Sequence, residues 1–150
     1  KPSFVEGVID LYHAIMKNDE ELAVKAYESW GFENISKELI NILNIWAKFL
    51  YSPLLENKVR KMEETNSTAY GAEAANKVHK ELKKIGGVKP PREFVFMDRA
   101  AIGLGSVFLH LDAELNWFKV FNELIDGFNK KKLENSQKKA LSKAKLVKTL

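Results

Sequence analysis

Residues 90–111 constrain the fold more than any other part of the chain. Two prolines open this run, and no residue after them breaks a helix outright. Pro91 suits the first turn of a helix, where the missing N–H costs nothing. Apolar side chains then recur at steps of three and four residues, at Phe94, Met97, Ala101, Leu104, Phe108 and Leu111. This spacing predicts a helix over 91–111.

The predicted helix is apolar over more than one narrow stripe. Further apolar residues widen it, at Phe96, Ala100, Val107 and Leu109. We therefore expect neighbours to contact this helix from more than one side. Gly103, Gly105 and Ser106 are poor helix formers at its centre, so we expect them to let a neighbouring helix come close. A phosphate-binding loop at Gly-Leu-Gly is less favoured, because no strand precedes it and no helix starts after it.

The N-terminal residues have the pattern of a helical hairpin over 4–30. Ser3 and Glu6 have the spacing of a capping box at the start of the first helix. Asn18-Asp19 lies between two apolar stripes and should end one helix and cap the next. Gly31 follows the second stripe, where a glycine commonly ends a helix.

Three further helices are predicted. Ser36 should cap a strongly amphipathic core helix over 36–51. Residues 69–85 place a thin apolar stripe beside lysines and glutamates, which is typical of a surface helix. Asp112 should cap a helix over 113–128.

No segment alternates between apolar and polar residues, and no tight Asn-Gly or Asp-Gly turn is present. We therefore predict an all-α fold without a sheet. It should have six to eight helices in an irregular orthogonal bundle. Helices 91–111 and 113–128 should pack on the hairpin and on helix 36–51.

Charge divides the chain into two parts. Residues 129–150 carry eight lysines and one glutamate, a net charge of +7, whereas the other 128 residues carry 16 basic and 19 acidic side chains. We therefore predict a helical domain over 1–128 and a basic C-terminal tail over 129–150. The tail could be a loosely docked helix or disordered, and a disordered, solvated tail is the more ordinary interpretation, because ends that are charged and poor in apolar residues usually lack structure.

The alternative for the tail is electrostatic docking on an anionic membrane surface. The candidate membrane contacts are Lys130, Lys131, Lys132, Lys138 and Lys139. Nucleic acid is not a predicted partner, because the tail has no arginine and no interleaved aromatic residue for base stacking.

The sequence shows no catalytic or metal-binding motif. It has no cysteine, and His13, His79 and His110 lie on three different predicted helices without a second ligand at metal-binding spacing. We therefore predict neither a metal nor a cofactor site in this chain. The many aromatic residues could line a lipid pocket, but their helical spacing favours a packed core.

Residues 90–117 also resemble the closing helices of a known protein family, and residues 4–128 do so more loosely. The matching residues are Arg92, Arg99-Ala100, Gly103-Leu104, Leu111, Ala113-Glu114 and Asn116. They are similar to residues of the UbiB/AarF family of atypical kinases. The resemblance implies a kinase-like fold and ATP-dependent chemistry linked to ubiquinone and other isoprenoid lipids.

The parts that perform this chemistry are missing from the sequence. Kinase-type phosphoryl transfer requires a loop over the phosphates, a lysine that binds them, a catalytic acid and an aspartate that holds magnesium. The chain has no Asp-Phe-Gly, no His-Arg-Asp and no Lys-x-Gly-Gln, which is the signature of the family. In the family these parts precede the matched helices. No catalytic residue is therefore carried over, and ATP and magnesium are implied only for the complete family protein.

Asp98 and Arg99 are the best charged candidates for a site, because they lie within the most apolar predicted helix. If they are partly buried, they must be paired or solvated, since an isolated buried charge is costly. The favoured interpretation is a structural ion pair that fixes helix packing. The alternative is a polar contact to a lipid or to a nucleotide-bearing lobe of the whole protein.

Two hypotheses for the function follow. In the first, the chain is the C-terminal helical part of a UbiB/AarF-type atypical kinase or ATPase, a helical extension of a kinase-like C-lobe. Its partners would be the upstream lobe of the same protein and an anionic membrane or isoprenoid lipid. In the second, the chain is a free-standing all-helical module that binds a lipid or a protein.

The expected location is the cytoplasm, with a peripheral position at the inner membrane. No apolar run approaches the roughly 20 residues that cross a bilayer, and no signal peptide is visible. Whether the chain belongs to an enzyme depends on which of the two hypotheses holds.

Overall fold

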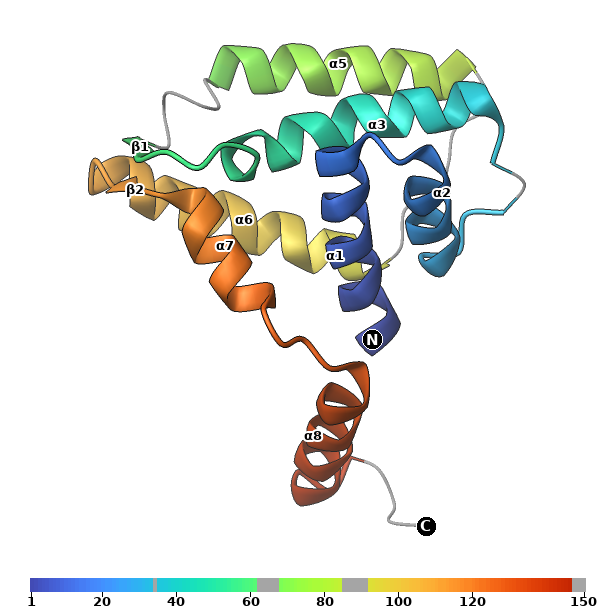
Figure 1. The fold of residues 1–150 in the computed structure, drawn as a ribbon, viewed down its shortest axis with the longest axis vertical. Helices are drawn as coiled ribbons and strands as arrows, with labels where there is room; N and C mark the ends of the chain where they lie inside the picture. The colour runs from blue at the N-terminus through green and yellow to red at the C-terminus, as the bar shows by residue number, and fades with distance from the viewer. Residues whose placement is uncertain (34, 62–67, 85–91, 147–150) are drawn as a thin grey trace.

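The computed structural model describes residues 1–33, 35–61, 68–84 and 92–146 (Figure 1). Its α-helices are α1 (Pro2–Lys17), α2 (Glu20–Ser29), α3 (Lys37–Tyr51), α5 (Thr68–Lys84), α6 (Arg92–His110), α7 (Trp117–Ile125) and α8 (Lys130–Lys143). A short 3-10 helix, η1 (Ser52–Leu54), follows α3 directly. Helices dominate the described residues, which confirms the predicted all-α fold.

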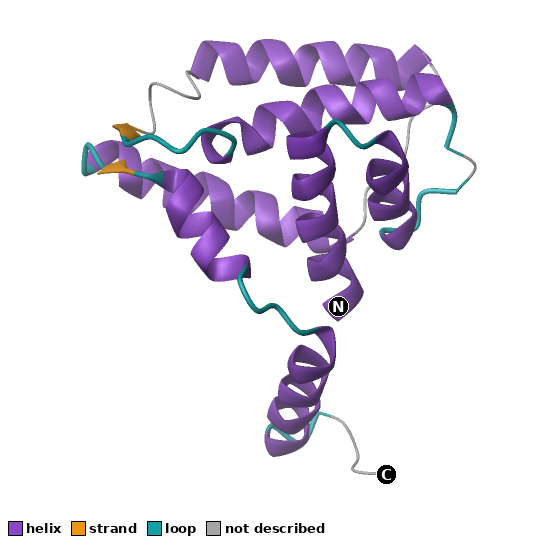
Figure 2. Ribbon diagram, viewed as in Figure 1, coloured by secondary structure: helices purple, strands orange, loops and turns teal. Residues whose placement is uncertain are grey.

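Two very short strands depart from the prediction of a chain without a sheet (Figure 2). β1 (Arg60–Lys61) and β2 (Glu114–Leu115) pair antiparallel, with Arg60 opposite Leu115. An alternating pattern cannot show in two residues, so the sequence carried no signal for this pairing.

The α1–α2 hairpin and the start of α3 form as predicted. Asn18 adopts the left-handed conformation at the end of α1, with φ of 53°. The Asp19 carboxylate accepts a backbone N–H at 3.0 Å and caps α2. Gly31 follows α2 with φ of 90°, a conformation that favours glycine. Ser36 Oγ accepts a backbone N–H at 3.1 Å and caps α3.

The capping box predicted at Ser3 and Glu6 is wrong. α1 begins at Pro2, and its N-cap residue, Lys1, forms no side-chain capping bond. Proline at the first position already sets the backbone angle of the first turn. The Glu6 carboxylate instead accepts a hydrogen bond from Lys130 Nζ at 2.7 Å.

The cap predicted at Asp112 is also wrong. Asp112 has φ of 50° and precedes β2, so the chain leaves α6 through a left-handed residue. α7 starts later than expected, at Trp117. Its cap is Asn116, whose Oδ1 accepts the Lys119 N–H at 2.9 Å. Asparagine and aspartate are both common caps, so residue type alone could not show that Asn116, and not Asp112, is the cap.

The buried core lies between α1, α2 and α3. Its buried members are Leu11, Tyr12, Ala14, Ile15, Ala23, Ala26, Tyr27, Ala47 and Tyr51. Phe121 and Ile125 of α7 pack against this core from its edge. The predicted packing of helix 113–128 on the hairpin and on helix 36–51 is therefore confirmed for α7.

Tyr12 is the most buried large side chain of the core, with 1% of its surface exposed. Its hydroxyl donates to the Leu54 carbonyl at 3.3 Å and accepts the Asn122 amide at 2.8 Å. Its ring meets Phe121 edge to face, with 4.8 Å between the ring centroids. Tyr12 therefore joins α1 to η1 and to α7.

Two other core tyrosines bond to neighbouring elements. The Tyr27 hydroxyl donates to Asn44 Oδ1 and the Tyr51 hydroxyl donates to the Val8 carbonyl, both at 2.8 Å. Burial raises the pKa of Tyr27 and of Tyr51 well above the ordinary value. Both hydroxyls therefore keep the protons with which they hold α2 and α3 in place.

α6 contacts the core near its ends. The Phe94 ring lies 5.0 Å from Phe4 and 4.9 Å from Trp30, and the Phe108 ring lies 5.1 Å from Trp117. On another side of α6 the large apolar side chains of Phe96, Leu104 and Val107 are exposed, so the further contact that was predicted is not found there. The side chains of Val95, Asp98 and Ile102 lie outside the described residues. The apolar pattern records which sides of a helix require cover, but not whether this chain supplies it.

The close helix contact predicted at Gly103 and Gly105 is found at Gly7 instead. A Cβ atom added at Gly103 or Gly105 would meet nothing within 4 Å. At Gly7 it would lie 2.5 Å from Trp30 Nε1, which donates to the Phe4 carbonyl at 3.1 Å. Gly7 therefore allows α1 to approach the end of α2.

Gly7→Ala should destabilise the chain, whereas Gly105→Ala should not. The methyl group at position 7 must displace Trp30, and such overpacking costs ~1–3 kcal/mol. Alanine at position 105 has room and gains about 1 kcal/mol of helix propensity. Urea unfolding followed by circular dichroism measures both changes. Equal midpoints for Gly7→Ala and the unchanged chain would contradict the close contact.

Candidate functional site

A row of exposed apolar side chains along α6 is the strongest candidate for a functional surface. It consists of Phe96, Ala100, Leu104, Val107 and Leu111, at steps of three and four residues. Phe96 is 74% exposed and Leu111, just after the helix, is 71% exposed. We call this set the α6 stripe. Its spacing places its members on one side of the helix.

The α6 stripe differs from the side of α6 that faces the core. Phe94, Met97 and Phe108 are half-buried, and the rings of Phe94 and Phe108 contact other aromatic residues. A helix that is apolar on two sides is normally covered on both. The sequence contained this signal in Phe96 and Val107, which widen the apolar surface beyond one narrow stripe.

α7 and β2 add to the exposed apolar area. Leu124 is 76% exposed, Val120 is 40% exposed and Leu115 is 39% exposed. Phe121 and Ile125 of the same helix pack against the core. Large contiguous apolar areas are rare on monomeric soluble proteins and usually mark an interaction site. The outer sides of α6 and α7 are therefore candidates for contact with another body.

Two exposed arginines accompany the α6 stripe. Within the described part of the chain, the side chains of Arg92 and Arg99 form no hydrogen bond and no ion pair. Both are available for acidic groups of a partner. The Asp98 side chain lies outside the described residues, so the proposed pair of Asp98 and Arg99 stays a hypothesis.

The basic segment forms a helix over much of its length. Residues 130–143 form α8, which agrees with the loosely docked helix and not with the disordered tail that was favoured. Lys130 donates to Glu6, and this hydrogen bond raises the pKa of Lys130. The other candidate lysines are exposed and form no ion pair within the described residues; they are Lys131, Lys132, Lys138 and Lys139. The Lys130–Glu6 bond thus joins α8 to α1, and the other four candidate lysines are exposed. Figure 1 shows α8 beside the N-terminal end of α1.

The histidines do not gather into a metal site. Among the residues that the structure describes, no group of three or more His, Asp or Glu side chains could hold a metal ion. His110 Nδ1 lies 2.8 Å from the Ser106 carbonyl, one turn back in α6. His13 lines an open surface pocket together with Asn122 and Asp126. These contacts are those expected of structural or solvent-facing histidines.

No helix in the described ranges has both the length and the apolar character that crossing a bilayer requires. Comparison with protein-family models, with curated proteins and with solved structures finds no match to this chain. The UbiB/AarF resemblance stays a hypothesis.

Phe96→Ser should leave the stability almost unchanged, whereas Phe94→Ser should reduce it. Phe96 is largely in water already, and such surface changes stay within about 0.5 kcal/mol. Phe94 loses two aromatic contacts, each of which contributes ~0.5–1.5 kcal/mol beyond the buried area. Urea unfolding of both variants tests this. A large loss of stability in Phe96→Ser would mean that the stripe is covered within this chain.

Proposed function

We propose that this chain is the C-terminal helical part of a UbiB/AarF-type atypical kinase or ATPase linked to ubiquinone or isoprenoid-lipid metabolism. The observation that carries the proposal is the exposed α6 stripe. In this proposal, the stripe is the surface on which the kinase-like lobe of the same protein packs.

The dimensions and chemistry of the stripe support this role. From Phe96 to Leu111 it extends about 22 Å along the helix axis at 1.5 Å per residue. That length accommodates a helix of a partner packed along it. Apolar residues at steps of three and four are the pattern by which one helix docks against another. Gly103 lies between Ala100 and Leu104 and has open space above it, so a backbone could come close there.

Under this proposal the chain supplies no reacting group. The lobe would bind ATP and magnesium, and the helices described here would complete its packing. Arg92 and Arg99 would face acidic side chains of the lobe at the edge of the interface, where charge fixes the register of the contact. The alternative, a free-standing module that binds a lipid or a protein, would use the same stripe for another occupant.

The coding sequence before the Lys1 codon separates these alternatives. We expect it to encode a kinase-like lobe with the Lys-x-Gly-Gln signature and the aspartate and asparagine that hold magnesium. The reason is that the α6 stripe requires a cover. A start codon directly before Lys1, with no such lobe, would contradict the first proposal and leave the free-standing module.

We further propose that α8 contacts an anionic membrane surface. The supporting observation is that four exposed lysines lie on one helix whose place is set by the Lys130–Glu6 bond. A lysine near such a surface contributes about 1 kcal/mol, and the attraction fades within a Debye length. α8 has no buried residue, so its lysines are available without unfolding the domain.

Replacing Lys131, Lys132, Lys138 and Lys139 with glutamine should abolish binding to anionic vesicles. Lys130 stays in this variant, so the bond to Glu6 is preserved. Co-sedimentation with phosphatidylserine vesicles at low ionic strength should retain the unchanged chain and release it in high salt, because surface charges are screened. If the variant binds as well as the unchanged chain, or if neither binds, α8 is not a membrane contact.

A further inference from the structure

Arg60 is the one charged side chain that is buried within the described part of the chain, with 8% of its surface exposed. Strand pairing fixes its position, since Arg60 lies opposite Leu115 in the β1–β2 ladder. The loop before Arg60 is also held in position, because Asn57 Oδ1 accepts a hydrogen bond from the Asn116 side-chain amide at 2.8 Å. A buried guanidinium is costly unless acceptors surround it. Its surroundings therefore require an explanation.

Two nitrogen atoms of Arg60 lack an acceptor. Nε and Nη2 are buried, and neither forms a hydrogen bond. They lie on the same edge of the planar guanidinium, where their N–H groups point in parallel. This edge is the donor pair that matches two oxygens of one carboxylate or phosphate group. Both atoms are donors only, so a fitting occupant must be an acceptor.

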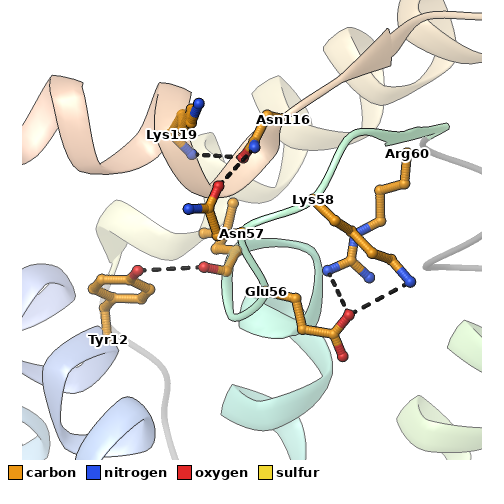
Figure 3. Close-up of polar contacts among 8 residues, drawn as sticks. Tyr12, Glu56, Asn57, Lys58, Arg60, Asn116 and Lys119 are labelled. Carbon is orange, nitrogen blue, oxygen red and sulfur yellow. Dashed lines mark hydrogen bonds and ion pairs between the residues drawn. The ribbon is translucent and has the colours of Figure 1, made fainter.

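The nearest charge partner holds Arg60 only loosely (Figure 3). Glu56 Oε2 lies 3.4 Å from Arg60 Nη2 and 3.5 Å from Lys58 Nζ, so two cations share one oxygen. The Glu56 side chain is 64% exposed. A carboxylate that is largely in water and forms ion pairs without a hydrogen bond to either cation can leave at small cost. Glu56 therefore lies beside one atom of the donor edge, Nη2, without satisfying it.

We propose that Arg60 is the centre of a binding site for a small oxyanion. A phosphate or carboxylate group would replace Glu56 and accept from Nε and Nη2 together. Lys58 would supply the second positive charge at the mouth of the site. The site lies in the β1–β2 corner, and it does not depend on the function proposed for the α6 stripe.

An anion fits this site better than a water molecule. Water would fill the donor edge but leave the buried positive charge without a counter-charge. The neighbouring Lys61 is already bonded to Asp112 at 2.6 Å, so that carboxylate is engaged elsewhere. When Glu56 moves away, Lys58 and Arg60 remain as two cations without a carboxylate between them.

The test is a titration of the full chain with inorganic phosphate and, separately, with acetate, each against chloride at equal ionic strength. Phosphate or acetate should raise the melting temperature saturably and shift the Arg60 Nε–Hε resonance in NMR spectra. The two arms distinguish a phosphate from a carboxylate as the source. Glu56→Gln removes the competing carboxylate and should tighten binding by roughly two- to fivefold, as expected from the loss of one exposed ion pair.

Two variants separate this site from other cations. Arg60→Lys keeps the charge but has no parallel donor pair, so the effect of phosphate should disappear. If Arg60→Lys fails to fold, Lys58→Met should still weaken binding in a folded chain. The variant in which Lys131, Lys132, Lys138 and Lys139 are glutamine should still be stabilised by phosphate, because those lysines lie outside the proposed site. The proposal is overturned if both anions stabilise the unchanged chain and Glu56→Gln no more than chloride does, or if the Arg60 resonance does not move.

Discussion

The fold depends on how the chain satisfies the buried hydroxyl of Tyr12. A hydroxyl with no access to water must find partners within the protein, and this one has two. It donates to the Leu54 carbonyl and accepts from the Asn122 amide, while the ring packs against Phe121. One side chain of α1 thereby fixes the end of α3, through η1, and the orientation of α7. The polar bonds select this arrangement among many apolar packings.

The exposed apolar surface follows from that arrangement. The core cluster is formed by α1, α2 and α3 with Phe121 and Ile125 of α7 packed against it, and no described residue of α6 belongs to it. α6 is held where Phe94 meets the N-terminal hairpin and where Phe108 meets Trp117. The α6 stripe lies on another side of the same helix and stays in water. A helix with two apolar sides and one covered side is the physical basis of the docking proposal.

The sequence predicted the features that depend on neighbouring residues in the chain, namely the helices and several of their caps. Asp19 and Ser36 cap helices because their side chains reach N–H groups three residues on, and periodicity gave the helices themselves. It did not predict what depends on distant partners. Gly7 and Gly105 look alike in sequence, but only Gly7 has a neighbouring helix against it. The burial of Arg60 could not be predicted, because it depends on a strand pair of two residues, which is too short to show an alternating pattern in the sequence.

The most direct test of the docking proposal compares amide hydrogen exchange in this chain and in the longer protein that the proposal expects, in which a kinase-like lobe precedes Lys1. The proposal predicts that exchange slows along α6, over 96–111, and along the outer turns of α7 in the longer protein. It predicts no change in α1, α2 and α3, because their buried side chains pack against one another within this chain. Equal exchange of α6 in both proteins would contradict the account, since the α6 stripe would then be uncovered in the whole molecule too.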